Sequence, residues 1–255
     1  MKVKQLVARQ RIRKGLLLLS LLFFPVTLYY FSPALILGGA AEGVVNGSFL
    51  VFGLMFLSSL FVGRLWCGWA CPAGALQEVA APVNNKRFSR GRADWTKWVI
   101  WIPWIGLIAF LAIRAGGYRA VDPLFQIPGG ATLAIPADSG GPPWWMIYYI
   151  ILVLFVGLAL VFGRRAGCHT VCWMAPFMIL GRWLRNRVHW PALTLMAEPT
   201  KCTDCLTCTR ECPMSLEVHE LVQRADMEDA ECILCGTCVD GCSQKAIRFS
   251  FGGGK

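Results

Sequence analysis

Eight cysteines near the C-terminus stand in two runs with the same spacing. The first run is Cys202-x2-Cys205-x2-Cys208-x3-Cys212, and the second is Cys232-x2-Cys235-x2-Cys238-x3-Cys242. Three closely spaced thiolates can cap three irons of a cubane, and the fourth, across the longer gap, serves the other cluster. The spacing therefore predicts two [4Fe–4S] clusters, one held by Cys202, Cys205, Cys208 and Cys242, the other by Cys232, Cys235, Cys238 and Cys212.

Two other uses of these cysteines fit the pattern less well. Structural zinc sites usually take two close pairs of ligands rather than two triplets with a fourth residue. Disulfides belong to oxidising compartments. All twelve cysteines of the chain fall into patterned sets, and thiolates kept ready for iron indicate a reducing compartment. We therefore expect the eight-cysteine segment to face the cytoplasm.

Two shorter motifs lie closer to the N-terminus. Gly63-Arg64 precedes Cys67-x3-Cys71-Pro72, and Gly163-Arg164 precedes Cys168-x3-Cys172. If the motifs meet, Cys67, Cys71, Cys168 and Cys172 can hold a third iron–sulfur cluster. A dithiol/disulfide switch and thiols without a function are the alternatives, and four soft ligands in a reducing compartment favour metal. His169 could bind the metal, relay protons or form an ordinary hydrogen bond.

Four stretches of the chain contain no charged residue: residues 15–37, 44–63, 98–113 and 144–163. The two Cys-x3-Cys motifs follow the second and the fourth of these stretches. The first is longer than the apolar part of a signal peptide, and at 1.5 Å per residue it can cross a hydrocarbon core of about 30 Å. Hydrophobic residues make up 56% of the chain and the mean hydropathy is +0.52. This composition is too apolar for an ordinary soluble fold.

The charge of the chain is unevenly distributed. Residues 1–190 carry nineteen basic and five acidic residues, whereas residues 191–255 carry six and ten, which together give the net charge of +10. The basic residues gather in segments 64–97 and 164–190. Because positive loops stay in the cytoplasm, we predict four transmembrane helices in the inner membrane with both termini cytoplasmic. Basic residues beside apolar runs indicate a membrane rather than a nucleic acid as the partner.

The two Cys-x3-Cys motifs stand at the ends of the second and fourth apolar stretches. Each follows a Gly-Arg pair, and both ends are predicted to lie on the cytoplasmic side. The first two and the last two helices therefore look like two copies of one hairpin, related by an axis along the membrane normal. The copies differ after the second cysteine, because Pro72 follows Cys71 but Trp173 follows Cys172.

The cysteine motifs resemble those of a known family. The stretch Cys67-Gly-Trp-Ala-Cys71-Pro-Ala-Gly-Ala-Leu-Gln77-Glu78, the second Cys-x3-Cys motif and the C-terminal runs are similar to the NapH-type membrane-bound 4Fe-4S ferredoxins. Related arrangements occur in the membrane part of NosR and in CcoG-type proteins. The C-terminal segment resembles bacterial-type two-cluster ferredoxins, except that Ser243 replaces a frequent proline. The resemblance implies an electron-transfer subunit that works between the quinone pool or a membrane partner and a redox enzyme.

These observations give one predicted architecture. An α-helical membrane bundle of four helices over residues 1–190 is followed by an α+β two-cluster ferredoxin domain over residues 191–255. The predicted function is iron–sulfur electron transfer with redox-enzyme partner subunits. One alternative is a quinol dehydrogenase with its own quinone site near the Cys-x3-Cys motifs; another is an assembly or regulatory factor that reduces a metal ion or a thiol. No apolar stretch contains a histidine, so bis-histidine haem is not expected.

Overall fold

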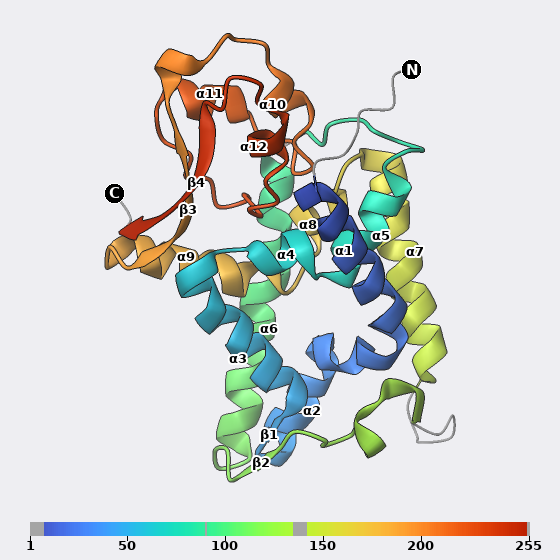
Figure 1. Ribbon diagram of the computed structural model, residues 1–255. Helices are drawn as coiled ribbons and strands as arrows, with labels where there is room; N and C mark the ends of the chain where they lie inside the picture. Colours follow the sequence, from blue (N-terminus) through green and yellow to red (C-terminus); the bar gives the residue numbers. More distant parts are fainter. Residues whose placement is uncertain (1–7, 90, 135–141, 254–255) are drawn as a thin grey trace.

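Five helices form the long axis of the molecule. The computed structural model describes residues 8–89, 91–134 and 142–253, and Figure 1 shows the start of α1 and the last strand at the same end of the molecule. The helices are α1 (Ala8–Thr27), α2 (Pro33–Glu42), α3 (Gly47–Val62), α6 (Thr96–Arg114) and α7 (Trp144–Phe162).

The first apolar stretch is not one continuous helix. The sequence predicts a span over residues 15–37, but α1 begins at Ala8 and the chain passes through a 3₁₀ turn, η1 (Leu28–Phe31), before α2 starts. Proline disfavours the interior of a helix because it lacks the N–H and clashes with the preceding turn, yet it suits the first helical position. Pro25 lies inside α1, two residues before its end. Pro33 occupies the first position of α2, and the Ser32 hydroxyl accepts a hydrogen bond from the Leu35 N–H at 3.4 Å.

Three stretches are long and apolar enough to cross a membrane: Ala8–Glu42, Ala93–Arg114 and Trp144–Phe162. The fourth predicted span, α3, is a shorter apolar helix of 16 residues. Large apolar side chains of α6 and α7, among them Ile113 and Val161, are exposed on the outside of the molecule. This outward apolar surface is the arrangement that hydrocarbon surroundings favour.

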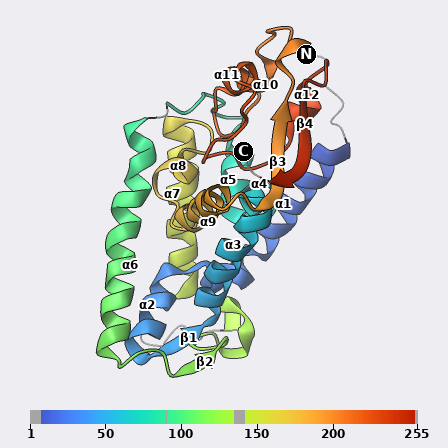
Figure 2. The ribbon, with the colours of Figure 1, turned by 90° about the vertical axis from the view of Figure 1, so that its left-hand side faces the viewer.

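Short helices gather at the end where α3 and α7 finish. They are α4 (Leu65–Trp69), α5 (Pro72–Ala80), η2 (Arg92–Trp95), α8 (Ala166–Thr170) and α9 (Ala175–Arg187). Helix α3 packs against α9, and α7 packs against α5. The α3–α9 crossing is close because Gly181 has no side chain; a Cβ there would lie 2.8 Å from the Phe56 carbonyl oxygen. Figure 2 shows α9 beside α3, partway along the length of α6 and α7.

The opposite end of the molecule is closed by a small parallel sheet. Strand β1 (Val44–Asn46) pairs with β2 (Ala120–Asp122), with Val44 opposite Ala120. Two 3₁₀ turns, η3 (Pro128–Gly130) and η4 (Thr132–Ala134), follow β2. This end contains none of the twelve cysteines.

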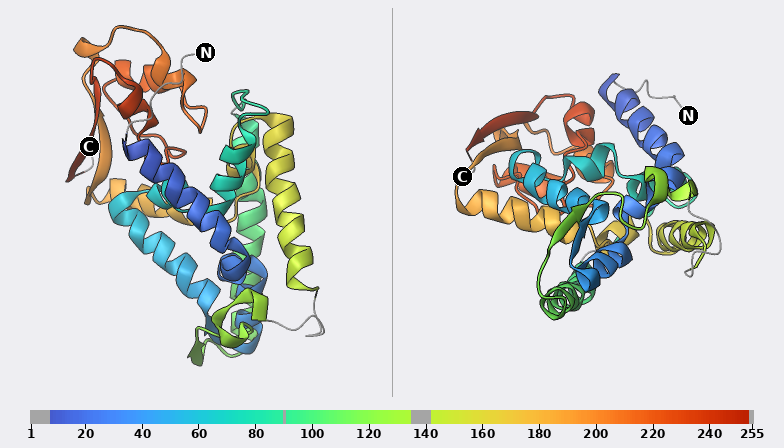
Figure 3. Two further views of the ribbon diagram at one scale, coloured as in Figure 1. Left: turned by 45° about the vertical axis from the view of Figure 1, so that its right-hand side comes forward. Right: turned by 90° about the horizontal axis from the view of Figure 1, so that it is seen from below.

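The C-terminal segment forms a compact α+β unit over the ends of the long helices (Figures 1 and 3). Strand β3 (Pro191–Ala197) pairs antiparallel with β4 (Ile247–Gly253), with Ala192 opposite Gly252. Between the two strands lie the four short helices of this unit: η5 (Pro199–Lys201), α10 (Thr207–Arg210), α11 (Val218–Gln223) and α12 (Thr237–Gly241). We call this unit the ferredoxin-like domain.

Candidate metal centres

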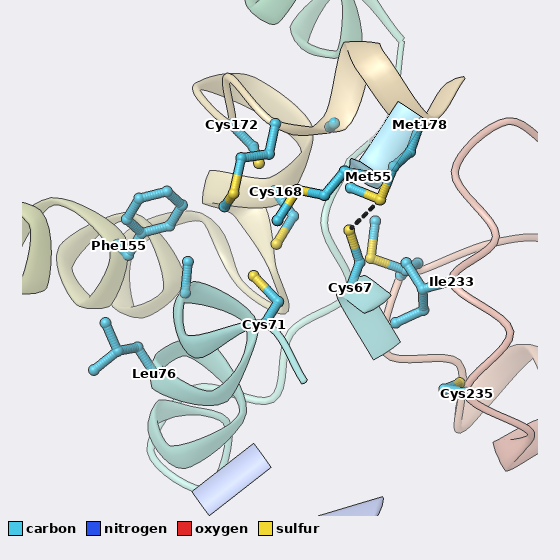
Figure 4. Close-up of a cluster of buried hydrophobic side chains, with 14 of the residues drawn as sticks. Met55, Cys67, Cys71, Leu76, Phe155, Cys168, Cys172, Met178, Ile233 and Cys235 are labelled. Atoms are coloured by element: carbon cyan, nitrogen blue, oxygen red, sulfur yellow. Dashed lines mark hydrogen bonds between the residues drawn. The ribbon is translucent and has the colours of Figure 1, made fainter. Parts of the chain in front are cut away.

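The four cysteines of the Cys-x3-Cys motifs meet in the interior. Cys67 lies on α4, Cys71 is the residue before α5, Cys168 lies on α8, and Cys172 follows α8. All four are almost fully buried. Figure 4 shows the side chains of these cysteines gathered around one place, with Cys67 and Cys71 coming from α4–α5 and Cys168 and Cys172 from the segment around α8. The juxtaposition that the matched motifs predict is thus present in the structure.

Each Cys-x3-Cys motif is followed by a helix that places one side chain beside the first cysteine of the other motif. Gln77 Nε2 lies 3.1 Å from Cys168 Sγ, and Met178 Sδ lies 3.9 Å from Cys67 Sγ. Gln77 follows Cys71 by six residues, and Met178 follows Cys172 by six residues. The two side chains are therefore equivalent in position although they differ in chemistry, and each ties α5 or α9 to the opposite motif.

Two buried arginines flank the four thiols. Arg64 is the residue before α4 and Arg165 the residue before α8, each three residues ahead of the first cysteine of its motif. Pairing the two motifs by their Gly-Arg dipeptides matches Arg64 with Arg164. The second motif, however, has one extra residue between this dipeptide and its first cysteine. Arg164 turns away and donates to the Asn85 carbonyl oxygen at 3.0 Å. The true counterpart of Arg64 is therefore Arg165.

The electrostatics of this site suit an anionic, thiolate-bound group. Burial raises the pKa of the Cys71 thiol well above its usual range and that of Cys172 to about 12, so without metal these thiols stay neutral. Within the described residues, Arg64 Nε and Nη2 and Arg165 Nε are buried without a hydrogen-bond partner. Four sulfurs beside buried guanidinium nitrogens that have no hydrogen-bond partner fit an iron–sulfur cluster, whose thiolates carry negative charge.

His169 is held by other partners than the thiols. Its Nδ1 lies 2.7 Å from Asp94 Oδ1, its Nε2 lies 3.1 Å from the Met214 carbonyl oxygen, and the Phe88 ring stacks on it at 4.8 Å. Both ring nitrogens are thus engaged by oxygen atoms. Of the three roles considered for His169, the structure supports hydrogen bonding that links α8 to the ferredoxin-like domain.

The eight remaining cysteines line two separate pockets of the ferredoxin-like domain. Cys202, Cys205, Cys208 and Cys242 line the first pocket, which is partly open. Cys212, Cys232, Cys235 and Cys238 line the second pocket, which is closer to the helices. Each pocket takes three cysteines from one run and the fourth from the other. This grouping matches the one predicted from the spacing.

The backbone around the two pockets repeats itself. Non-glycine residues adopt left-handed conformations at Asp204, Leu206 and Ser215, and residues thirty positions later, Leu234, Gly236 and Lys245, do the same. These residues flank the second cysteine of each run or follow the fourth cysteine by three positions, where the chain must wrap around the sulfurs. Such conformations are costly for residues with a side chain. Their repetition at equal offsets indicates two copies of one cluster-binding loop.

The second pocket lies directly against the Cys-x3-Cys site. A Cβ on Gly68 would collide with the Ile233 carbonyl oxygen, so the chain beside Cys67 touches the chain beside Cys232. Trp69 Nε1 donates to the Leu234 carbonyl oxygen at 3.1 Å. The sequence did not predict this contact. The small residue between Cys67 and Trp69 was its only sequence signal, because glycine often marks a close approach of two backbones.

Helix α1 also reaches the ferredoxin-like domain. Gln10 Nε2 donates to the Cys235 carbonyl oxygen at 3.0 Å and to Asp240 Oδ2 at 2.6 Å. Arg9 forms an ion pair with Asp240 at 3.0 Å. The basic N-terminal residues, interpreted from the sequence as a topology signal, therefore have a structural role at the second pocket as well.

A buried ion group joins the two parts of the protein. Glu231 of the ferredoxin-like domain accepts from Arg64 at 2.7 Å and also pairs with Lys97. Burial by itself would raise the pKa of the Glu231 carboxyl, but the charges of Arg64, Lys97 and His169 lower it to about 2. Glu231 is therefore ionised over the whole physiological pH range.

Helix α9 makes a second connection. Arg182 Nε lies 2.8 Å from Glu228 Oε2, and Arg185 Nη2 lies 2.7 Å from Glu228 Oε1. The charges of both arginines outweigh the effect of burial and lower the pKa of the Glu228 carboxyl. These two ion pairs connect α9 to the ferredoxin-like domain.

Two family models match the chain in the cysteine-rich regions. A 4Fe-4S binding domain matches residues 47–91, which include Cys67 and Cys71. A 4Fe-4S dicluster domain matches residues 201–247, which include all eight cysteines of the ferredoxin-like domain. The first model therefore matches the segment that contains the first Cys-x3-Cys motif, and not the C-terminal cysteine runs.

Curated relatives match over most of the chain. NapH of Escherichia coli, a ferredoxin-type protein, is 24% identical over 91% of this chain and 77% of its own length. An uncharacterized protein of Methanocaldococcus jannaschii is 24% identical over 89% of this chain and 79% of its own. YccM, a putative electron transport protein of Escherichia coli, is 25% identical over 80% of this chain but 56% of its own length. No solved structure shows a significant match. The chain is thus a relative of the NapH-type ferredoxins, as its cysteine motifs predict.

Proposed function

We propose that this protein is a membrane-anchored iron–sulfur subunit that relays electrons between a membrane donor or acceptor and a redox enzyme. The observation that carries the proposal is the arrangement of twelve cysteines in three sets of four, two in pockets and one in the buried site between the halves of the bundle. The electron-transport names of YccM and NapH-type relatives agree with it. The partner enzyme would be a further subunit.

The residues of each set have distinct tasks. When bound, a [4Fe–4S] cluster supplies reversible one-electron transfer. Cys202, Cys205, Cys208 and Cys242 would hold the cluster nearest the surface, and Cys212, Cys232, Cys235 and Cys238 would hold the inner one. Cys67, Cys71, Cys168 and Cys172 would hold a third cluster. Gln77 and Met178 position this third set, and Gly68 lets it approach the inner pocket closely.

Iron and sulfide content tests the proposal directly. Anaerobically purified full-length protein should contain about twelve iron and twelve sulfide per chain, since each of three cubanes holds four of both. About eight of each would leave the ferredoxin-like domain filled and remove the third cluster. A protein that binds zinc and no iron would end the electron-transfer proposal.

Two single substitutions should separate the clusters of the ferredoxin-like domain. Cys205→Ser should perturb the signal of the outer cluster, because Cys205 lines the first pocket and not the second. Cys235→Ser should perturb the signal of the inner cluster for the corresponding reason. Electron paramagnetic resonance of the reduced variants measures this. Loss of both signals in each variant would contradict the grouping of the ligands.

The arrangement of the helices in the membrane is part of the proposal. We propose that α3 is a fourth crossing helix, that α1–α5 and α6–α9 are two related halves, and that both termini face the cytoplasm. The equivalent places of Gln77 and Met178, and of Arg64 and Arg165, support the related halves. A reporter fused after Lys255 should be active only in the cytoplasm, and one inserted near Ser139 only outside. Activity of the first reporter outside the cytoplasm would overturn this orientation.

A quinol dehydrogenase is the second candidate, because a cavity lies beside the third set. The cavity has a volume of about 490 Å³, within the range of small-molecule sites, and both apolar and charged side chains line it. Leu17 and Leu18 of α1 form part of its wall, together with Val79 of α5. Gln77 lines the cavity and also donates to Cys168 Sγ. A bound quinol would therefore be one side chain away from the third set.

Filling the cavity should separate the two candidates. A pure relay should reduce no quinone at a useful rate without its partner, whereas a quinol dehydrogenase should transfer electrons from quinol to its clusters. Leu17→Trp should then abolish quinol-dependent cluster reduction, while reduction by dithionite stays normal. Rates from stopped-flow absorbance measure this. Equal rates in the Leu17→Trp variant and the parent protein would exclude this cavity as the quinol site.

A further inference from the structure

The third set is flanked by two ion groups of the same composition. On one side Glu231 pairs with Arg64 at 2.7 Å and with Lys97. On the other side Glu78 pairs with Arg165 at 2.5 Å and with Arg13 at 2.8 Å. Each group thus combines two cations with one carboxylate. The side chains of all four cations are at most 4% exposed, so water screens their charges poorly.

The two arginines of these ion groups lie beside the four thiols. Arg165 Nη1 donates to the Cys67 carbonyl oxygen at 2.8 Å, and Arg64 is the residue before α4, the short helix that carries Cys67. The buried nitrogens without a partner among the described residues belong to the same two arginines. The neighbouring carboxylate, Asp94, faces His169 at 2.7 Å and is partly exposed. Each ion group therefore leaves one net positive charge beside the four-cysteine site.

The two ferredoxin pockets have different charged neighbours. At the outer pocket Asp204 Oδ1 lies 3.6 Å from Cys202 Sγ, and Cys205 is exposed. At the inner pocket Arg182 Nη1 donates to the Cys232 carbonyl oxygen at 3.3 Å, and Arg182 shares Glu228 with Arg185, so this pocket has one such group of two cations and one carboxylate. The outer pocket therefore has an acidic neighbour and open solvent, and the inner pocket has one ion group whose carboxylate is 34% exposed. The membrane site has two ion groups, whose carboxylates are only 6% and 17% exposed, and so has more buried positive charge.

We propose that Arg64 and Arg165 raise the reduction potential of the four-cysteine site above the potentials of both ferredoxin pockets, so that the first electron to enter the protein resides there. The inference rests on the proposed third cluster. Adding one electron makes a thiolate-bound cluster one unit more negative, and nearby buried positive charge stabilises that reduced form. The two arginines are positioning residues that act on the cluster's charge and need not bind iron.

Stepwise reduction tests the order of the potentials. Full-length protein in detergent is titrated with dithionite in the presence of redox mediators, and electron paramagnetic resonance follows each signal. The first signal to appear should be the one that Cys67→Ser removes. If the first electron instead produces a signal that Cys205→Ser or Cys235→Ser removes, the proposal is wrong. If the parent protein holds only eight iron, the third cluster fails first, which is a failure of the proposed function.

Charge variants test the cause, and they predict shifts of opposite sign. Arg165→Gln should make the midpoint potential of the third signal more negative, whereas Glu78→Gln should make it more positive. Arg164→Gln is the matched control for the third signal, because Arg164 is the neighbouring arginine but donates to the Asn85, Arg210 and Cys212 carbonyl oxygens and not to the four-cysteine site. A shift in the control as large as in Arg165→Gln, or shifts of the same sign in Arg165→Gln and Glu78→Gln, would overturn the proposal.

A fourth variant covers the case in which Arg165→Gln fails to hold the third cluster. Arg165→Lys keeps the positive charge but loses the forked geometry of the guanidinium. Retention of the third signal in Arg165→Lys, with its loss in Arg165→Gln and with both ferredoxin signals intact, supports a role of the charge. Equal loss in both variants would show that shape rather than charge is required, and would contradict the inference.

Discussion

Serine in place of any one of four cysteines is expected to remove the same spectroscopic signal while both ferredoxin signals persist. The four residues are Cys67, Cys71, Cys168 and Cys172. They come from two motifs about one hundred positions apart, yet their thiols are mutually close enough that each of Cys67, Cys168 and Cys172 raises the pKa of Cys71 in addition to burial. A group held by all four should therefore be lost, or changed to a form with fewer sulfur ligands, in every variant. The loss amounts to about four of twelve iron per chain.

The matched control for these variants is Met178→Leu. Met178 Sδ is 3.9 Å from Cys67 Sγ and is fully buried, so this change alters a sulfur next to the site without removing a proposed ligand. Replacement of methionine by leucine conserves volume and usually costs under about 1.5 kcal/mol. The third signal should remain. Serine variants that affect one motif but not the other, or mass spectrometry that finds disulfides within Cys67–Cys71 and Cys168–Cys172, would favour the thiol switch instead.

The grouping of the eight cysteines could be predicted because it follows from local spacing. A run with two short gaps can only place three sulfurs around one centre, and the pseudo-symmetric partner run supplies the fourth. The structure groups the same residues in two pockets. The meeting of the two Cys-x3-Cys motifs could also be anticipated, since each ends a helix on the same side of the molecule.

Contacts between the two halves could not be predicted from one sequence. Gln77 was noticed only as part of a resembling motif, and nothing in its surroundings indicated that it reaches Cys168. Met178 occupies the equivalent place, but a thioether in an apolar helix looks like ordinary core. The register of the arginines was wrong by one residue, because pairing by the Gly-Arg dipeptide ignores the insertion that makes Arg165, not Arg164, the residue before α8.

The length of the helices was predicted better than their continuity. Helix α7 and the predicted span over residues 144–163 agree within one residue, because an uninterrupted apolar run has no competing signal. In the first span the local effect of Pro33 divides the run into α1 and α2. The contacts of Gln10 with the inner pocket lie outside what hydropathy can reveal, because they depend on how the ferredoxin-like domain docks.

Removing the charge of Glu231 is expected to weaken that docking most strongly. Glu231 is the shared partner of Arg64 and Lys97, and all three side chains are at most 6% exposed. In Glu231→Gln the two cations remain buried without a carboxylate between them. Breaking a buried ion pair by removing one partner costs about 3–5 kcal/mol, because the remaining charge stays in a low-dielectric environment. Thermal unfolding followed by tryptophan fluorescence should therefore begin at a clearly lower temperature.

Glu217→Gln is the matched control, since Glu217 also links the two parts of the protein through an arginine. Its pair with Arg87 spans 2.7 Å, but the Glu217 side chain is 54% exposed. Solvent-exposed pairs contribute about 0–1 kcal/mol, so this variant should unfold almost as the parent protein does. Lys97→Met should fall between the two, because it leaves the Arg64–Glu231 pair intact. Iron content is measured in each variant to separate loss of docking from loss of a cluster. Equal unfolding temperatures for Glu231→Gln and Glu217→Gln, at equal iron content, would show that the buried ion group does not hold the ferredoxin-like domain on the helices.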